Sequence, residues 1–414
     1  MSKNFVPLSS ICIEKGLQTG PFGSQLKANE YTSEGIPIVM PKDIEAGRVS
    51  TKSIARTSFQ KAKQLKKHFI KPGDILFPRR GDLGRIAVAS TDNEGWICGT
   101  GCLRARIKEN ISFSYIHQFL MLPQVLRWLE TNALGQTMLN LNTEIISELP
   151  IVLPPLPEQQ RIAEILSTWD KAIEATEKLI ANSEAQKKVL MQQLLTGKKR
   201  LPGFDGEWNP KTLDALGKTY TGLSGKTKAD FGSGKPFVPY KNVFANVELN
   251  MSELEFVRLS DGEKQNIVKS GDIIFTTSSE TPEEVGMSSA VLTDIGELYL
   301  NSFCFGFRIE KQNEFTPSFA KHLFRSAELR RAISSLAQGS TRYNLSKNEF
   351  LKINIHLPKR AEQEQIVEVL DAVETVHAKE QMKLTHLKSE KKALMQQLLT
   401  GKRRVKIEEE DKNA

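Results

Sequence analysis

The chain has 414 residues, 39% of them apolar and 26% charged, and its formal net charge is +8 at pH 7. At roughly 150 residues for a typical domain, this length predicts several domains, each with enough apolar residues for a buried core. The composition excludes a disulfide-rich secreted protein and a membrane protein, because the four cysteines are scattered and no apolar run reaches the roughly 18 residues of a membrane-spanning helix.

The first region, residues 1–156, has apolar alternation, frequent Gly and Pro and a short helical candidate at 114–130, which predicts a strand-rich α/β domain. Within it, segment 42–85 carries twelve Lys and Arg residues against four Asp and Glu residues, an excess typical of a polyanion-binding surface. A solvated basic face is the alternative interpretation. DNA or RNA is favoured because the loop-like stretch 78–85 interleaves arginines with glycines, so the backbone can approach phosphates and Arg can contact guanine. The candidate DNA-binding residues of this region are Lys42, Lys66, Lys67, Arg79, Arg80 and Arg85.

A long helix is predicted next, within 157–200, because apolar residues recur at alternating steps of four and three, the heptad pattern of a helix that packs along one seam. Pro157 suits the first helical turn and Gly197 a left-handed C-cap, so the helix should span about 157 to 196. At 1.5 Å per residue it would be roughly 55 to 60 Å long. Its seam residues are Ile162, Leu166, Trp169, Ile173, Ile180, Leu190 and Leu194.

The second region, residues 201–360, is a diverged copy of the first, with a short helical candidate at 318–337. Four pairs of segments correspond in order along the chain: 35–43 with 234–242, 71–77 with 269–275, 106–107 with 308–309, and 135–141 with 339–345. The stretches after these framework segments differ completely, which indicates one scaffold with two different reading surfaces. Asn can make a bidentate contact to adenine, which makes Asn242 a plausible reader. The candidate DNA-binding residues are Lys226, Lys228, Tyr240, Lys241, Asn242, Ser278, Arg342 and Tyr343.

A second long helix is predicted within 361–404, and the string LMQQLLTGK at 190–198 recurs there at 394–402. A repeat with a shift of 204 residues is a duplicated domain with its connector rather than a solenoid unit. The two helices most simply pair with each other, although a homodimeric coiled coil would leave the same pattern. The seam residues of the second helix are Ile366, Leu370, Val373, Leu384, Leu387, Leu394 and Leu398. The acidic tail 405–414 is predicted to be disordered.

Motifs of catalysis and cofactor binding are missing from the sequence. Ser224–Thr227 resembles the end of a phosphate loop, but the position of its leading glycine is occupied by Tyr220. Cys98 and Cys102 are four residues apart without a second pair or a histidine cluster, so no metal site is predicted. We therefore predict no catalytic residues and no bound cofactor.

Three segments carry a resemblance to a known family: Leu153–Ile162 leading into the first long helix, Leu190–Gly197 closing it, and Leu201–Trp208 starting the second half. With the tandem layout, the chain resembles the specificity subunit of type I restriction and modification systems. The resemblance implies an α+β fold, with two tandem strand-rich α/β target recognition domains separated by two long helices that form an antiparallel coiled coil in a pseudo-twofold repeat. The stretch Pro202–Trp208 occurs only once, which leaves open how the first domain is attached to the end of the second helix.

The resemblance also implies a function. Each recognition domain would read one half of a split, asymmetric sequence in double-stranded DNA, and the helices would set the gap between the halves and dock two modification (methyltransferase) subunits. The chain itself would be non-catalytic and cytoplasmic, with no membrane partner. S-adenosylmethionine would be used by the modification subunits, and ATP and Mg by the restriction (translocase and nuclease) subunits. The implied parts are recognition domains at 1–156 and 201–360, spacer helices at 157–200 and 361–404, and the tail 405–414.

Two alternatives belong to other classes. In an adaptor protein, the coiled coil would mediate homodimerisation and both domains would bind protein; salt-dependent binding to duplex DNA separates this reading from the first. A self-sufficient methyltransferase would need a Gly-rich cofactor turn and an N-P-P-aromatic motif, and the sequence contains neither.

Overall fold

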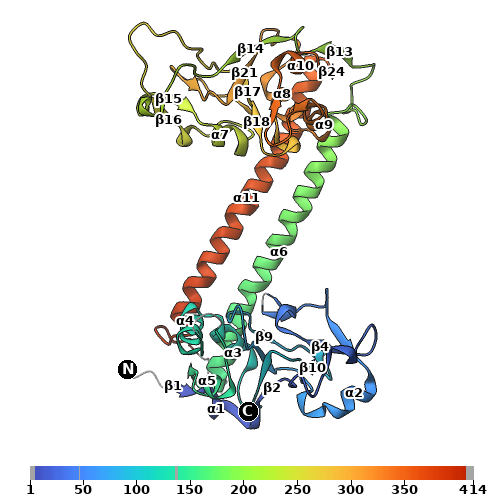
Figure 1. Ribbon diagram of the computed structural model, residues 1–414, viewed down its shortest axis with the longest axis vertical. Helices are drawn as coiled ribbons and strands as arrows, with labels where there is room; N and C mark the ends of the chain where they lie inside the picture. Colours follow the sequence, from blue (N-terminus) through green and yellow to red (C-terminus); the bar gives the residue numbers. More distant parts are fainter. Residues whose placement is uncertain (1–4, 46, 136–138, 407–414) are drawn as a thin grey trace, which may run out of the picture. The chain divides into compact units, whose positions relative to one another are not determined.

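The computed structural model describes residues 5–45, 47–135 and 139–406, so the predicted acidic tail lies outside the described residues from 407 onward. The chain divides into two compact units, the first formed by residues 1–177 and 383–414 and the second by residues 178–382. Each unit therefore contains one strand-rich region and one part of each long helix (Figure 1). The two units are described one at a time.

The first unit is built on two four-stranded sheets. The antiparallel sheet has the order β2 (Cys12–Thr19), β11 (Cys102–Ile107), β8 (Ile75–Pro78), β9 (Ala87–Val88), and the mixed sheet has the order β10 (Ile97–Cys98), β4 (Ile36–Val39), β7 (Ala55–Thr57), β3 (Tyr31–Thr32). Two strand pairs complete it: β1 (Phe5–Pro7) with β12 (Pro150–Val152), and β5 (Ile44–Glu45) with β6 (Arg48–Val49). The short α-helices are α1 (Leu8–Ile11), α2 (Phe59–Gln64), α3 (Phe113–Leu120), α4 (Pro123–Asn132) and α5 (Thr143–Ser147).

The second unit repeats this plan with local differences. Its antiparallel sheet has the order β14 (Gly217–Thr221), β21 (Cys304–Ile309), β17 (Asp272–Thr276), β19 (Ser288–Ala290). The smaller sheets are β16 (Glu255–Val257), β15 (Phe231–Val238), β20 (Tyr299–Leu300); β18 (Ser278–Ser279), β23 (Tyr343–Leu345), β22 (Ala337–Gln338); and β13 (Asn209–Thr212) with β24 (Asn354–Leu357). The short α-helices are α7 (Tyr240–Ala245), α8 (Pro317–Leu323), α9 (Ala327–Ser335) and α10 (Lys347–Leu351).

Both predicted short helices are in fact pairs of helices. Residues 114–130 form α3 and α4, which separate because the residue before Pro123 cannot easily continue a helix. Residues 318–337 form α8 and α9, and the side chain of Ser326 caps α9 by accepting a hydrogen bond from the Leu329 N–H. The predictions were right about helical content and wrong about continuity.

The two long helices, α6 (Leu156–Leu194) and α11 (Arg360–Leu398), have 39 residues each and are unbroken in Figure 1. In the first unit, the ion pair between Asp170 and Lys391 joins them, with 2.6 Å between Oδ1 and Nζ. In the second unit, Lys187 and Glu374 are 2.8 Å apart. Low residue numbers on one helix face high numbers on the other, so the helices are antiparallel in each unit.

The predicted seam is the buried side of both helices. Every residue that the heptad pattern assigns to it is buried or half-buried. In the first unit, Ile162 and Leu166 of α6 join Leu398 of α11 in the core of the strand-rich region. In the second unit, Leu194 of α6 joins Ile366 and Leu370 of α11 in the same way. The helices are thus part of each core.

The ends of the long helices are fixed by contacts that recur with the 204-residue shift. Gly197 and Gly401 both have positive φ, +68° and +69°, as a left-handed C-cap requires. Beyond them, Arg200 contacts the Glu362 carboxylate in the second unit, and Arg404 contacts Glu158 in the first. Arg404 therefore joins the end of the second helix to the start of the first, without a copy of the segment Pro202–Trp208.

The adjacent glutamines act in the same repeated manner. Gln159 accepts a hydrogen bond from the Ser112 N–H at 3.0 Å, just before α3, and donates to the Pro154 carbonyl. Gln363 accepts from the Thr316 N–H at 2.9 Å, just before α8, and donates to the Pro358 carbonyl. The glutamine at each helix start therefore ties the helix to its own strand-rich region.

Candidate nucleic-acid interface

The main candidate site in each unit is the loop that follows the central strand of the antiparallel sheet, after β8 in the first unit and after β17 in the second. In the first unit, the Arg79 carbonyl accepts a hydrogen bond from the Leu141 N–H at 2.8 Å. The next residue, Arg80, forms an antiparallel β-bridge with Asn140. The Arg79 N–H donates to the Gly101 carbonyl at 2.7 Å. Main-chain bonds therefore fix the start of this loop.

The second unit holds its loop with the same three main-chain contacts. The Thr277 carbonyl accepts from the Leu345 N–H at 2.9 Å, Ser278 pairs with Asn344, and the Thr277 N–H donates to the Phe303 carbonyl at 2.8 Å. Because main-chain bonds do not depend on the side chains, the two loops keep one backbone arrangement while their side chains diverge. The first loop is basic, and the second carries Ser, Thr and Glu.

The arginines of the first loop differ in their freedom to bind a ligand. Arg79 is half-buried, and its Nε donates to the Leu141 carbonyl at 3.4 Å, so it belongs partly to the loop scaffold. Arg80 is exposed, and Arg85 is exposed beside Asp82, with 3.2 Å between Nε and Oδ2. Gly81, with φ +83°, supplies the turn between them. Arg80 and Arg85 are therefore the two guanidinium groups that the loop presents to solvent.

The three lysines predicted in the first region, Lys42, Lys66 and Lys67, are all exposed on short 3-10 helices, at Pro41–Asp43 and Lys66–His68. Lys42 donates to the Ser53 carbonyl at 3.2 Å. Their DNA-binding role stays a prediction.

Two residues predicted to bind DNA in the second region are used inside the domain, and the prediction is wrong for both. Asn242 is 0% exposed. Its amide donates to the Asn250 carbonyl at 2.8 Å and accepts from the Asn250 N–H, so it cannot reach an adenine. The Lys226 side chain is 8% exposed, and its ammonium pairs with Glu263.

Three other predicted residues come together around one open cavity of about 480 Å³. The Tyr240 hydroxyl donates to the Ser278 carbonyl at 2.8 Å, and burial raises the pKa of that hydroxyl. Arg342 donates from Nε to the Ser278 Oγ at 3.2 Å. Tyr343 lies opposite Ser279 in the strand pair beside them. Lys228 and Lys241 are exposed but do not line this cavity.

The cavity also contains residues that the sequence did not single out. These are Phe244, Ser279, Glu280, Glu284 and Thr341. Phe303, 52% exposed, lies 5.3 Å from the guanidinium of Arg342. The sequence did contain one signal that could have identified these residues. At the framework position where the first loop has arginines, the second loop has polar and acidic residues.

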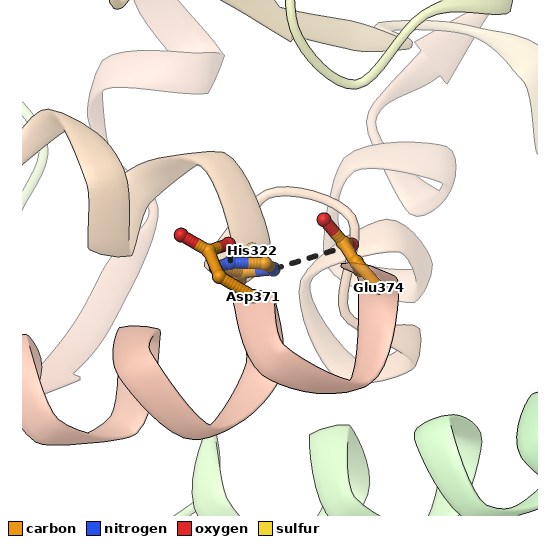
Figure 2. Close-up of side chains that lie close together, drawn as sticks. All are labelled: His322, Asp371 and Glu374. Atoms are coloured by element: carbon orange, nitrogen blue, oxygen red, sulfur yellow. Dashed lines mark hydrogen bonds and ion pairs between the residues drawn. The ribbon is translucent and has the colours of Figure 1, made fainter. Parts of the chain in front are cut away.

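A cluster of His322, Asp371 and Glu374 has donor atoms that a metal ion could bind (Figure 2). The His322 Nε2 lies 2.8 Å from the Asp371 Oδ1, and its Nδ1 lies 3.7 Å from the Glu374 Oε1. However, the Lys321 ammonium is 2.7 Å from the Asp371 Oδ1, and Lys187 pairs with Glu374. Since two ammonium groups already contact these carboxylates, the cluster is suited to joining α8 to α11 rather than to holding a cation.

Comparison with known proteins places these features in a family. The model of the type I restriction modification DNA specificity domain matches twice, at residues 17–184 and 206–388. A Methanocaldococcus jannaschii protein, provisionally named the MjaX type I restriction enzyme specificity subunit, is 24% identical over 397 residues, 90% of this chain and 88% of that protein. The MjaVIII specificity subunit of the same organism is 26% identical over 294 residues, 67% of this chain and 68% of that protein. The crystal structure of the type I restriction-modification S subunit from M. genitalium has a TM-score of 0.58 at 15% identity and covers 96% of this chain and 97% of that one.

The chain therefore belongs to the family of type I restriction-modification specificity subunits, and its two strand-rich regions belong to the family's DNA recognition domains. The predicted family and the predicted fold class are both confirmed. In the part of the chain that the structure describes, no helix combines the length and apolar character needed to cross a bilayer.

Proposed function

We propose that this chain recognises a split, asymmetric sequence in double-stranded DNA, one half with each recognition domain, and that it has no catalytic centre of its own. The observation that carries the proposal is the pair of loops held by the same main-chain bonds with different side chains, arginines at 79 and 80 in one and Thr277 and Ser278 in the other. Two equivalent loops with different chemistry would select two different half-sites.

The chemistry of the complex belongs to partner subunits in this proposal. The chain docks two modification subunits, which methylate adenine with S-adenosylmethionine, and restriction subunits, which use ATP and Mg²⁺. The pairing of Lys226 with Glu263 supports this division, because the lysine of the incomplete phosphate-loop motif is already occupied.

The long helices would act as the spacer that sets the gap between the half-sites. Each is 39 residues long, about 58 Å at the rise of an α-helix, which is ample for half-sites about one DNA turn apart. Two linked recognition domains would also raise the overall affinity through effective concentration, so that each domain can bind weakly alone.

The first test is the pattern of methylated adenines in DNA modified by this chain together with its modification subunit, read by single-molecule sequencing. We expect one split motif with two short defined halves and a fixed gap. Methylation without sequence preference, or association with the modification subunit without any methylation, would favour the adaptor interpretation.

The second test concerns the exposed arginines of the first loop. The double variant Arg80→Ala/Arg85→Ala should lower the slope of log affinity against log salt by about 1 to 2, since each phosphate contact contributes about 0.9. The control is Lys108→Ala, an exposed residue beyond the opposite end of β11 from the loop. An unchanged slope in the double variant would remove this loop from the DNA interface.

A further inference from the structure

The cavity of the second recognition domain differs in charge from the basic loop of the first. It is lined by two carboxylates, Glu280 and Glu284, and by one guanidinium, Arg342. Carboxylates repel the phosphate backbone, so this cavity is poorly suited to the non-specific contacts that the first loop can make. Its chemistry instead fits the edge of a base.

The hydrogen-bonding atoms of the cavity are held in place by the surrounding residues. The Glu284 Oε2 accepts from the Ser279 hydroxyl at 3.1 Å and from the Thr281 hydroxyl at 3.0 Å, which leaves its Oε1 without a donor in the described part of the chain. Arg342 uses Nε to bind Ser278, and among the described residues its two terminal nitrogens contact no acceptor. Both residues line the same open cavity, so one acceptor and one pair of donors at its edge have no hydrogen-bond partner in the described part of the chain.

The backbone under these groups is held by hydrogen bonds. β18 pairs with β23, and the Tyr240 hydroxyl bonds to the Ser278 carbonyl. Tyr240 and Phe244 stack at 6.0 Å between ring centroids and form one wall of the cavity. Groups fixed in this way lose little entropy on binding, which is the condition for strong discrimination between bases.

In the major groove, a single base pair can offer both a donor for the carboxylates and acceptors for the guanidinium. Cytosine presents its N4 amino group, which Glu accepts well, and guanine presents O6 and N7, which Arg binds in a bidentate manner. An A·T pair also carries an amino group, but its acceptors, adenine N7 and thymine O4, lie on different bases, whereas guanine offers O6 and N7 side by side to the guanidinium.

We propose that this cavity reads a cytosine–guanine base pair in the half-site of the second domain, with Glu284 accepting from cytosine N4, Glu280 as a second acceptor, and Arg342 donating to the guanine. The inference rests on the proposed function, since it assumes that the second domain contacts base edges.

The experiment compares the methylated motifs produced by the full-length chain and its variants with the modification subunit. In Glu284→Gln, discrimination at one C·G pair should relax about fivefold or more, because a good base contact is worth about 1 to 3 kcal/mol. Arg342→Ala should relax the same base pair. The matched control, Glu283→Gln, changes an exposed neighbour that does not line the cavity and should leave the motif unchanged.

The outcomes separate the inference from the function. A wild-type chain that yields no split motif overturns the proposed function. A split motif that Glu284→Gln and Arg342→Ala leave intact, or alter at different base pairs, overturns the cavity assignment alone.

Discussion

The same arginine–glutamate pair occurs at the start of each long helix. The contributions of the two pairs to stability can therefore be compared within one chain. Arg200 donates to Glu362 through Nε at 2.6 Å and Nη2 at 2.7 Å, and it also contacts the carbonyls of Asp205 and Gly206. Arg404 donates to Glu158 through Nε at 2.7 Å and through Nη2. We predict that Arg200→Ala destabilises the second unit more than Arg404→Ala destabilises the first.

The size of each effect follows from exposure. The Glu362 side chain is 1% exposed and Arg200 is 24% exposed, so removing the arginine leaves a buried carboxylate unpaired, at a cost of about 3 to 5 kcal/mol. The first turn of α11 reduces this cost by about 1 kcal/mol, because a helix N-terminus stabilises negative charge. About 2 to 4 kcal/mol should remain. Glu158 is also buried, at 3% exposed, but Arg404 is 64% exposed, so water can enter the space that the arginine leaves and solvate the carboxylate. We therefore expect about 1 to 2 kcal/mol for Arg404→Ala.

Hydrogen exchange of peptides covering the first turn of each long helix measures these losses locally. The control is Arg360→Ala, which breaks an exposed pair with Glu364 in α11 and should cost less than about 0.5 kcal/mol. Equal losses for Arg200→Ala and Arg404→Ala, or a larger loss for Arg404→Ala, would refute the argument that burial of the pair determines its contribution.

Two further predictions concern the helix pair. Burial, with repulsion from Lys321, lowers the pKa of His322, so the folded state binds fewer protons and the second unit should lose stability as pH falls below about 6.5. The first unit has Gln118 at the position equivalent to His322. The variant His322→Gln should therefore reduce the change in thermal stability between about pH 5 and pH 7. An unchanged pH dependence would exclude His322 as its source. Insertion of four residues, about one turn, into both long helices should change the gap in the methylated motif, whereas an unaltered gap would refute the spacer role.

The sequence predicted the parts of the fold that depend on periodicity. The residues that the heptad steps assigned to the seam are all buried or half-buried, some of them in the cores of the strand-rich regions. Gly197 was correctly assigned to a left-handed cap, since only glycine adopts that conformation without cost. These predictions succeed because, within one helix, the spacing of two residues in the sequence decides whether their side chains lie on the same face.

Site residues were less predictable because their environment depends on distant segments. Asn242 resembles a base reader in sequence, but a turn brings Asn250 to its amide. Lys226 resembles a phosphate ligand, but Glu263 lies 37 residues away in the chain and pairs with it. Conversely, the cavity around Arg342 required β18 and β23 to pair, which no local pattern indicated.

The repeated contacts and the diverged loops differ in how well they can tolerate amino-acid substitutions. The ion pairs Asp170–Lys391 and Lys187–Glu374 occupy matching positions in the two units, and each also contacts the strand-rich region, through Gln118 in one and His322 in the other. Substitutions there would alter the framework itself. The loops, in contrast, are held by main-chain hydrogen bonds, so their side chains can be replaced without loss of those bonds. In the proposed function, a new half-site could therefore arise from loop substitutions alone, while the framework of the helices stays unchanged.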